Sequence, residues 1–356
     1  MNRREFLGCC VAAGMNIGLG GLVSCLRSNV SFSQADNAKL SGMLIADAHA
    51  HPHQLHGSTR YDGTTPTIET MKQVGMAASS FSAVGDRVKY GGMSGMPFNN
   101  TMNQLKKVRK FEEKKCVRLI RKASDVPLSI GPNDALGAVM AIEGGDALAG
   151  KIKNLHKFYE YGVRMITVMH DHNNEIGFNQ RSQPDGPLTL FGIQVVERMN
   201  ELGMIIDVAH SKTQTLKSIG EVCAAPLIDS HTNPLPYGFE PSKPSRLRTW
   251  AEMELVAKTG GVICTWPLAY SRGSHPRSTL RHWAEEIAEI KKRLGIEHVG
   301  LGTDGGGRLP QTVKGWKTIL SLPKLIGAMK EVGLSQEDIA AYVGGNFLRV
   351  LNQCLS

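Results

Sequence analysis

The 356-residue sequence contains few aromatic residues, few cysteines and no internal repeat or low-complexity tract. Phe, Trp and Tyr together make up 6% of the chain, and the 7 cysteines include no CxxC pair, which argues against a zinc knuckle or a disulfide framework. The glycine-rich stretch 300–307 lacks the Walker pattern, which argues against a phosphate-binding loop of that type. Apolar residues make up 41% of the chain, which is enough for a sizeable core.

Positive charge is in modest excess, but it is not distributed as nucleic-acid binding requires. The formal net charge is +9, and the Lys and Arg residues are scattered among acidic ones. The one basic concentration, residues 106–122, lacks interleaved aromatic residues and is typical of the solvated face of a helix. The sequence therefore predicts no nucleic-acid partner.

The first 25 residues have the pattern of an export signal. A short charged start is followed by an apolar stretch that several glycines make too polar and too short for a stable membrane span. Residues 2–7, Asn-Arg-Arg-Glu-Phe-Leu, resemble the twin-arginine export signal. The expected location is therefore the periplasm or envelope of a bacterial cell.

Two interpretations of the signal's end remain open. Residues 22–25, Leu-Val-Ser-Cys, resemble a lipobox, in which Cys25 would carry a lipid anchor. The alternative is ordinary cleavage after Ala35, where small residues occupy both recognition positions. In either case residues 26–40 are expected to form a tether and residues 41–356 a single domain.

After the tether, apolar runs of strand length alternate with amphipathic intervals about eight times. This alternation predicts parallel βα units that close into a (β/α)8 barrel of the TIM type. The predicted strands are Leu44–His49, Ala78–Val84, Ala138–Glu143, Arg164–Met169, Met204–His210, Pro226–His231, Gly261–Trp266 and His298–Asp304. The predicted helices are Thr101–Lys122, Ala147–Tyr161, Thr189–Leu202, Lys212–Val222, Thr249–Thr259, Leu280–Leu294, Ile319–Val332 and Ser335–Gln353, with the last two completing the outer ring.

Residue types that bind metals stand at the ends of several predicted strands, where the active sites of such barrels are built. His49 and His51 are two residues apart, so the period of a strand puts both side chains on one face. Glu143 ends another apolar strand, and a buried carboxylate there needs a cationic partner. With one oxygen for each of two ions, Glu143 could bridge a pair of metals.

His210 and His231 end successive strands, which are neighbours in a parallel barrel, and they are the expected pair for a second ion. Asp304 ends the last strand, faces the barrel mouth and could move the proton of an attacking water to the leaving amine. Asp207 and Asp229 could orient these imidazoles, or each could hold barrel backbone. Six other histidines are expected to be ordinary core or surface residues: His53, His56, His156, His275, His282 and His298.

Six motifs resemble, in order and spacing, the membrane dipeptidase (renal dipeptidase-like) family of metallopeptidases: DAHAHP, AIEGGD, TVMHDHNN, DVAHS, SHTNP and HVGLGTDGGG. They extend over essentially the whole of the predicted domain. The resemblance implies a (β/α)8 barrel, two zinc ions bridged by a glutamate, and dipeptide substrates, often with a D-residue at the C-terminal position.

Carried over by position, the resemblance implies that Asp304 is the acid/base and that His170 contacts the substrate and stabilises the tetrahedral oxyanion. It implies that Arg246 binds the substrate carboxylate, a task suited to a guanidinium, with Arg248 as the alternative. The implied ligands of two zinc ions bridged by Glu143 are His49, His51, Glu143, His210 and His231.

Two positions depart from the family pattern. The family usually has Asp where this chain has His51, so the first metal site would carry one less negative charge. It also tends to have Asp-Phe-Asp-Gly where this chain has Asp-Gly-Gly-Gly at 304–307, which removes a second acid and an aromatic residue near the pocket. Both departures leave the metal preference and the substrate open.

The sequence therefore favours a binuclear zinc dipeptidase that hydrolyses the peptide bond with a metal-bridging hydroxide. One alternative is an amidohydrolase acting on a cyclic amide or lactone, although Met169 and His170 stand where such enzymes often carry a modified lysine. Another is a metal-binding envelope protein without activity, against which Asp304 and Arg246 argue. The natural substrate remains open, as does the oligomeric state, for which a homodimer is one candidate.

Overall fold

The computed structural model describes residues 40, 42–57, 63–86, 96–128, 134–236, 245–272 and 275–355. The predicted export signal, the predicted lipid-anchor residue Cys25 and all but the last residue of the predicted tether lie outside these residues. Within the described part of the chain, no helix combines the length and the apolar character that a membrane crossing requires.

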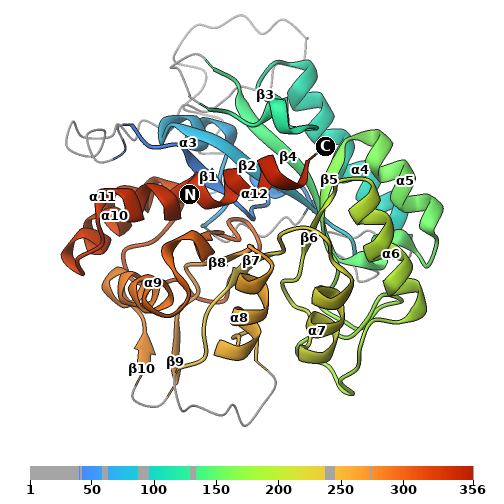
Figure 1. Ribbon diagram of the computed structural model, residues 1–356. Helices are drawn as coiled ribbons and strands as arrows, with labels where there is room; N and C mark the ends of the chain where they lie inside the picture. The colour runs from blue at the N-terminus through green and yellow to red at the C-terminus, as the bar shows by residue number, and fades with distance from the viewer. Residues whose placement is uncertain are drawn as a thin grey trace, which may run out of the picture. The chain divides into compact units, whose positions relative to one another are not determined.

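Eight parallel strands form the barrel that the sequence predicts (Figure 1). Their order around the sheet follows the order of the chain, and the first and last strands meet where the Ala48 amide donates to the Leu301 carbonyl at 3.0 Å. The barrel strands are β1 Ile45–Asp47, β2 Met76–Val84, β4 Leu136–Glu143, β5 Val163–Thr167, β6 Ile205–Asp207, β7 Ile228–Thr232, β8 Val262–Thr265 and β11 Val299–Leu301.

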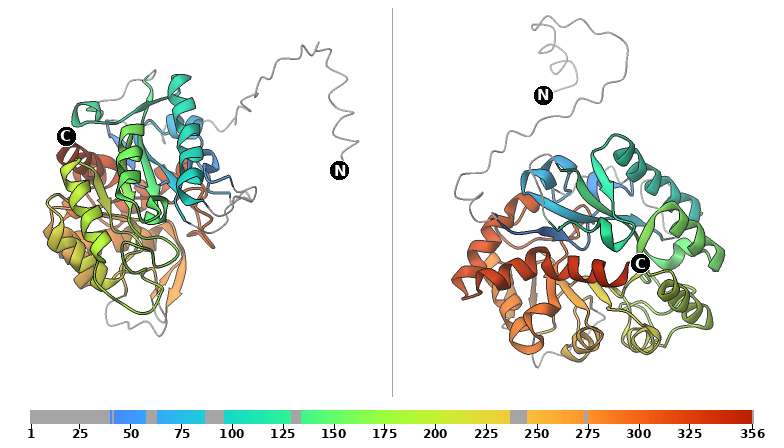
Figure 2. Two further views of the ribbon diagram at one scale, coloured as in Figure 1. Left: turned by 90° about the vertical axis from the view of Figure 1, so that its right-hand side faces the viewer. Right: turned by 45° about the horizontal axis from the view of Figure 1, so that its top comes forward.

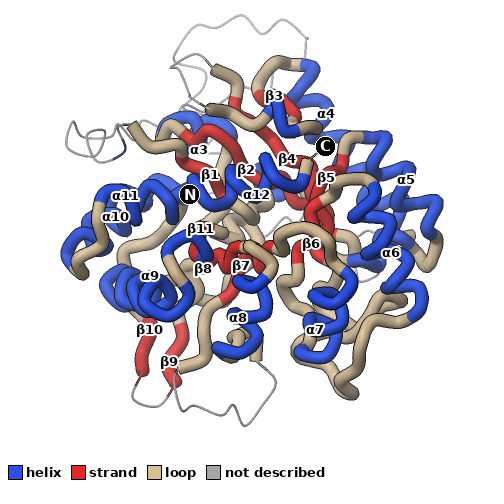
Figure 3. Tube along the Cα trace, viewed as in Figure 1, coloured by secondary structure: helices blue, strands red, loops and turns tan. Residues whose placement is uncertain are grey.

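Helices surround these strands, as the blue and red tubes of Figure 3 show. Several helices start directly after a Thr or Ser whose side chain accepts an amide hydrogen of the first turn, as Thr189, Thr249 and Ser335 do. The helices are α3 Ile68–Gln73, α4 Pro97–Glu113, α5 Ile152–Tyr161, α6 Leu190–Glu201, α7 Thr213–Val222, α8 Trp250–Lys258, α9 Leu280–Leu294, α10 Leu322–Glu331, α11 Gln336–Ala340 and α12 Asn346–Cys354. Short 3-10 turns are η1 Pro52–Gln54, η2 Ala123–Asp125, η3 Gly145–Leu148, η4 Ile296–His298 and η5 Ile319–Ser321, and η6 Ala341–Gly345 is a π-helical turn.

The C-terminal helix α12 closes one end of the barrel instead of completing the outer ring, which corrects the sequence prediction. It crosses the ring of strands in Figure 1 and in the right-hand view of Figure 2. Its apolar residues Phe347, Val350 and Leu351 belong to the same buried cluster as Ile205 and Ile228 from the strands. Because α12 covers this end, the opposite end, where the strands finish, is the one open to a ligand.

The prediction of one helix over Thr101–Lys122 was wrong at its C-terminal end. Lys115 adopts a left-handed backbone conformation (φ 55°) after α4, and the chain continues as the short strand β3, Val117–Leu119. Val117 and Leu119 are buried, and β3 pairs in parallel with β4 outside the barrel path. Helical periodicity could not reveal this because the burial comes from a partner strand distant in sequence. A second unpredicted feature is the antiparallel pair β9 Tyr270–Arg272 and β10 His275–Arg277.

Candidate metal centre

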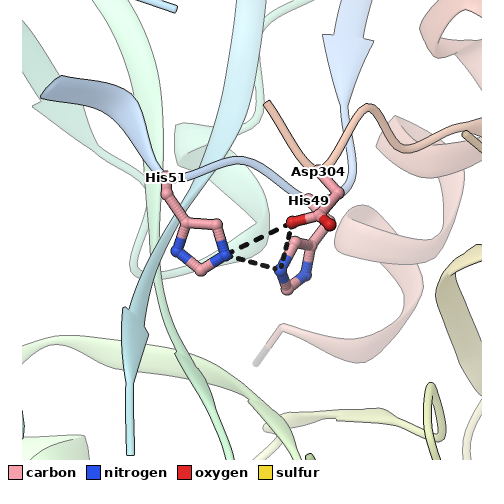
Figure 4. Close-up of side chains that lie close together, drawn as sticks. All are labelled: His49, His51 and Asp304. Atoms are coloured by element: carbon pink, nitrogen blue, oxygen red, sulfur yellow. Dashed lines mark hydrogen bonds and ion pairs between the residues drawn. The ribbon is translucent and has the colours of Figure 1, made fainter. Parts of the chain in front are cut away.

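The structure brings His49, His51 and Glu143 together at the open end of the barrel. The Nε2 atoms of His49 and His51 lie 3.3 Å apart, and each lies close to Glu143, at 3.5 Å from Oε1 and 3.3 Å from Oε2 respectively. Asp304 joins the group, with Oδ1 at 3.5 Å from His51 and 4.0 Å from His49 (Figure 4). All four side chains are buried.

His210 and His231 approach the same glutamate from the neighbouring strands. Their Nε2 atoms lie 3.2 and 3.4 Å from Glu143 Oε1 and 2.8 Å from each other. Glu143 therefore faces two pairs of imidazoles at once. Ligands held about 2.0–2.1 Å from one tetrahedral ion lie roughly 3.3 Å from one another, so both groups have the spacing of ligands around an ion.

A single hydroxyl fixes the tautomers of two of these imidazoles. Ser230 Oγ donates to Asp207 Oδ2 at 2.6 Å, so it accepts hydrogen bonds from His231 Nδ1 at 2.9 Å and His49 Nδ1 at 3.1 Å. His51 Nδ1 likewise donates to the Ser82 carbonyl at 2.9 Å. With the hydrogen on Nδ1, each neutral ring presents the lone pair of Nε2 to the centre, which is the form that binds a metal.

Asp207 takes both of its predicted roles: Oδ2 orients the imidazoles through Ser230, and Oδ1 accepts the backbone amides of Ala209 and Ser230 at 3.0 Å. Asp229 supports the backbone through Arg248, whose Nε donates to it at 2.6 Å. Arg248 also donates to the carbonyl oxygens of Ser211 and Val208 and is 1% exposed. Arg248 is therefore a support of the barrel backbone and is unsuited to the alternative role as carboxylate ligand.

In the ion-free protein, the pKa values of the clustered side chains indicate which protons bound metal ions would replace. Burial alone would lower the pKa of His51, but the charges and hydrogen bonds of Asp304 and Glu143 raise it to about 10. Burial lowers the pKa of His210 to about 3, with the positive charge of Arg246 as the next contribution. The pKa of Glu143 is held well below its usual value because nearby imidazoles outweigh the effect of its burial. The carboxylate is thus compensated by positive charge, which ions would supply in place of protons.

Two residues of the centre have strained backbone conformations. His210 and Asp304 follow the ends of β6 and β11 in the left-handed region, with φ of 64° and 47°. The Asp304 amide donates to the His49 carbonyl at 2.8 Å, and the His210 carbonyl accepts from the Gln180 amide at 2.6 Å. Residues held this way cost roughly 1–3 kcal/mol each and cluster at functional sites.

His170, predicted to contact the substrate, lies beside the centre. Its Nε2 is 3.5 Å from Glu143 Oε1, and its Nδ1 is hydrogen-bonded to Asp86 Oδ2 at 2.5 Å. Burial alone would lower the pKa of His170, but the charges of Glu143 and Asp86 raise it to about 9. Asp86 was missed in the sequence because it follows a strand end without any recognisable motif, and only the fold brings it to a residue 84 positions away.

The centre opens into a pocket of about 470 Å³. Arg246 lines it, as predicted for a substrate-binding residue, and its NH2 group contacts Asp171 Oδ1 at 2.9 Å. His56, expected to be an ordinary histidine, is buried and hydrogen-bonded to the Gly306 carbonyl but also lines the pocket. The sequence did not single out two further lining residues, Arg181 and Arg308.

The sequence of this chain matches a known protein family. Residues 58–355 match the membrane dipeptidase family, peptidase family M19. The chain belongs to this family. The resemblance found in the six motifs is thereby confirmed. The match begins after His49 and His51, so the place of these two histidines in the centre rests on the geometry alone.

Curated relatives of this M19 chain include two fungal proteins. Dipeptidase verJ of Clonostachys rogersoniana is 28% identical over 257 residues, which cover 71% of this chain and 64% of the relative. Dipeptidase aclJ of Aspergillus oryzae is 28% identical over 220 residues, covering 61% of this chain and 51% of the relative. The matched part of the chain thus spans between half and two thirds of the length of these relatives.

Solved structures share the barrel. The probable dipeptidase PvdM of Pseudomonas aeruginosa superposes with a TM-score of 0.75 at 19% identity, over 90% of this chain and 98% of that one. A metallo peptidase of Rhodobacter sphaeroides, liganded with a phosphinate mimic of the dipeptide L-Ala-D-Ala, superposes with a TM-score of 0.73 at 19% identity, over 88% of this chain and 99% of that one. At this identity the similarity establishes the fold of the M19 chain.

Proposed function

We propose that this M19 protein is a binuclear metal-dependent dipeptidase. The observation that carries the proposal is the position of Glu143, whose carboxylate lies within 3.5 Å of the Nε2 atoms of both histidine pairs at the base of a pocket. His49, His51 and Glu143 would hold one ion, and Glu143, His210 and His231 the other. Imidazole and carboxylate ligands with about 3.3 Å between them suit zinc, the metal that we propose.

Two bound ions would supply an activated water and would polarise the carbonyl of the scissile bond. Asp304 lies at the rim of the first group, within 4.0 Å of both His49 and His51, and lines the pocket. In this position its carboxylate can accept the proton of the attacking water and deliver it to the amine that leaves. We therefore assign Asp304 as the acid/base.

His170 and Arg246 are the groups that would position the substrate. The hydrogen bond between Asp86 and His170 Nδ1 fixes the imidazole so that Nε2 points to the centre, where it can donate to an oxyanion. Arg246 lines the same pocket and retains guanidinium hydrogens that Asp171 does not use. It is therefore placed to bind the free carboxylate of a dipeptide.

An arginine that binds the free carboxylate would allow one residue after the scissile bond, and the small pocket would limit the residues before it; together these features support a dipeptide as the substrate. The dipeptide mimic bound to the Rhodobacter relative carries a D-residue at its C-terminal position. We infer that this chain also accepts a C-terminal D-residue. The alternative of a cyclic amide or lactone has no separate observation in its favour.

The test combines metal analysis with turnover. The protein is expected to bind two zinc ions per chain and to release amino acids from L,L and L,D dipeptides. Asp304→Asn should lower turnover by about 10²- to 10⁴-fold, the usual contribution of a general acid/base, while metal content stays at two ions. Robust hydrolysis of cyclic amides with none of dipeptides would contradict the proposal, and so would full activity of the Asp304→Asn variant.

We also propose that the protein is exported and anchored in the bacterial envelope by a lipid on Cys25. The support is the sequence alone: the twin-arginine pattern at 2–7 and the lipobox-like residues 22–25. Cys25→Ser should move the protein from the membrane fraction to the soluble fraction of the cell envelope. Unchanged partitioning would rule out the anchor and favour cleavage after Ala35.

A further inference from the structure

Three arginines line the pocket above the metal centre, and each belongs to a different loop at the open end of the barrel. Arg181 follows β5, Arg246 follows β7 and Arg308 follows β11. Among the described residues that line this pocket, the carboxylates are Glu143 and Asp304, and both belong to the metal centre. Arg246 is paired with Asp171, so Arg181 and Arg308 are the further cationic side chains of this lining.

The position of Arg308 is built into the loop that follows Asp304. A Cβ at Gly307 would lie 1.8 Å from Asp304 Oδ1, so a larger residue there would displace that carboxylate from its present position. The Gly306 amide donates to Thr64 Oγ1 at 3.1 Å, and its carbonyl is bonded to His56 Nε2 at 2.9 Å. These contacts hold the turn that brings Arg308, with a left-handed φ of 65°, to the pocket wall.

The position of Arg181 is fixed through its neighbour Gln180. The Gln180 amide donates to the His210 carbonyl at 2.6 Å, and its side-chain nitrogen donates to the Leu247 carbonyl at 2.9 Å. The Arg181 amide itself donates to Asn179 Oδ1 at 2.8 Å. The backbone of Arg181 is thus joined both to a candidate metal ligand and to the loop that carries Arg246.

We propose that the pocket selects dipeptides that contain an aspartate or glutamate residue. This inference rests on the proposed dipeptidase function and specifies its substrate class. The free C-terminal carboxylate of any dipeptide needs one guanidinium, for which Arg246 is placed. Arg181 and Arg308 then offer two further guanidinium groups to a carboxylate on a substrate side chain, and charge-assisted hydrogen bonds of this kind are among the stronger ones in proteins.

The test compares isosteric substrates. The zinc-loaded full chain is assayed with Ala-Glu against Ala-Gln and with Glu-Ala against Gln-Ala, using L and D forms of the second residue. For at least one pair, kcat/KM should be about tenfold higher with Glu than with Gln, the effect expected of one charge-assisted hydrogen bond at a partly exposed site. The preference should shrink as salt is raised, because exposed charges are screened.

Substitutions of Arg181 and Arg308 test whether these two side chains cause the preference for Glu over Gln substrates. Arg181→Met and Arg308→Met should each reduce the ratio of kcat/KM for Glu substrates to kcat/KM for Gln substrates toward 1, and Arg308→Lys should retain part of the ratio. Arg118→Met, an exposed position on β3 outside the pocket, is the matched control and should leave the ratio unchanged. Both test positions are exposed, so the variants are expected to fold, which thermal unfolding checks.

A ratio near 1 in the unaltered protein, or a high ratio that both methionine variants retain, overturns the inference and leaves the dipeptidase proposal standing. Absence of any dipeptide turnover in the protein with two zinc ions overturns the dipeptidase proposal instead. In that case calorimetric titration of Ala-Glu and Ala-Gln into the zinc-loaded chain decides the inference separately. Equal affinities for the two would contradict it, and tighter binding of Ala-Glu, lost in Arg308→Met, would support it.

Discussion

At the scale of single residues, the candidate metal centre depends on a hydroxyl that is not itself a proposed metal ligand. Ser230 Oγ links Asp207 to the Nδ1 atoms of His49 and His231, which are proposed ligands of different ions. A buried network of this kind holds ring orientation and tautomer together, because a flipped ring would lose its Nδ1 partner. Both proposed sites therefore share one supporting residue.

We expect Ser230→Ala to weaken zinc binding by about 10- to 100-fold, the usual effect of removing a partner behind a histidine ligand. The affinity can be measured by competition with a chromophoric chelator. Ser211→Ala is the matched control, because Ser211 is also a buried serine but its Oγ has no hydrogen-bond partner among the described residues. Equal affinities of the two variants would contradict the role of Ser230.

Protons compete with metal at His51. In the ion-free protein, burial opposes the charge of His51, but Asp304 and Glu143 raise its pKa to about 10, so the ring is protonated at neutral pH. A raised histidine pKa stabilises the ion-free fold fully below about pH 6.5, and this contribution is lost as the pH rises through about 10. A zinc ion bound at His51 would have to displace this proton, so zinc affinity should rise with pH across the neutral range.

Calorimetry of zinc binding at pH 7 in buffers of different ionisation enthalpy measures the protons released. The unaltered protein should release about one proton from His51 on zinc binding, whereas His51→Asp, which already carries a negative charge, should release fewer. The variant also introduces the residue usual in the family at this position. Equal proton release from both proteins would show that His51 is not protonated in the ion-free state.

At the scale of elements, the turn η6 joins α11 to α12 and packs against β1, the strand that precedes His49 and His51. Gly344 packs so closely that a Cβ there would lie 2.1 Å from the Leu44 carbonyl and 2.5 Å from the Ala46 amide nitrogen. The π-helical turn thus lets the C-terminal helices reach the first strand. The prediction of one continuous helix over Ser335–Gln353 was therefore wrong at Gly344, whose φ of 178° and ψ of −31° interrupt the helix.

Gly344→Ala should lower the free energy of unfolding by about 2–3 kcal/mol, because a methyl group would push against strand backbone that cannot move aside cheaply. Gly220→Ala, within α7, is the matched control: no atom lies within 4 Å of its added Cβ, and it should raise stability by roughly 0.5–1 kcal/mol. Chemical denaturation measures both changes. An unchanged free energy of unfolding in Gly344→Ala would mean that η6 can shift to accommodate the added methyl group.

At the scale of the whole domain, the proposed ions would join strands that are far apart in sequence. The ligands come from β1, β4, β6 and β7 or from residues directly after them, and Glu143 connects the two groups. Ions bound at a thousand times their dissociation constant stabilise the folded chain by about 4 kcal/mol each. Their removal should therefore be visible in global stability as well as in activity.

Chelation of both ions is expected to lower the melting temperature by roughly 15–30 °C, given about 8 kcal/mol from the two ions together and the usual change of about 2–4 °C per kcal/mol for a domain of 150–250 residues. Differential scanning calorimetry measures the shift, and adding zinc back should restore it. A melting temperature that stays constant while elemental analysis confirms metal loss would mean that the cluster does not bind ions tightly.

The sequence by itself determined the barrel, because the alternation of apolar strands and amphipathic helices is a local pattern that the fold preserves. It also supplied His49, His51, Glu143, His210 and Asp304, since polar residues directly after buried strands must gather at one end of a parallel barrel. The family match confirmed the resemblance that the six motifs had indicated.

Only the tertiary structure decided the residues around that set. Asp86 and the pocket arginines Arg181 and Arg308 stand in no motif, and Ser230 begins the SHTNP motif without any sign there of its role; their partners or the pocket that they line come from loops and strands remote in the chain. The same holds for the short strand β3 and for α12 at the closed end of the barrel. Periodicity reports which side of an element is buried, but the neighbour that buries it is chosen by the packing of the whole domain.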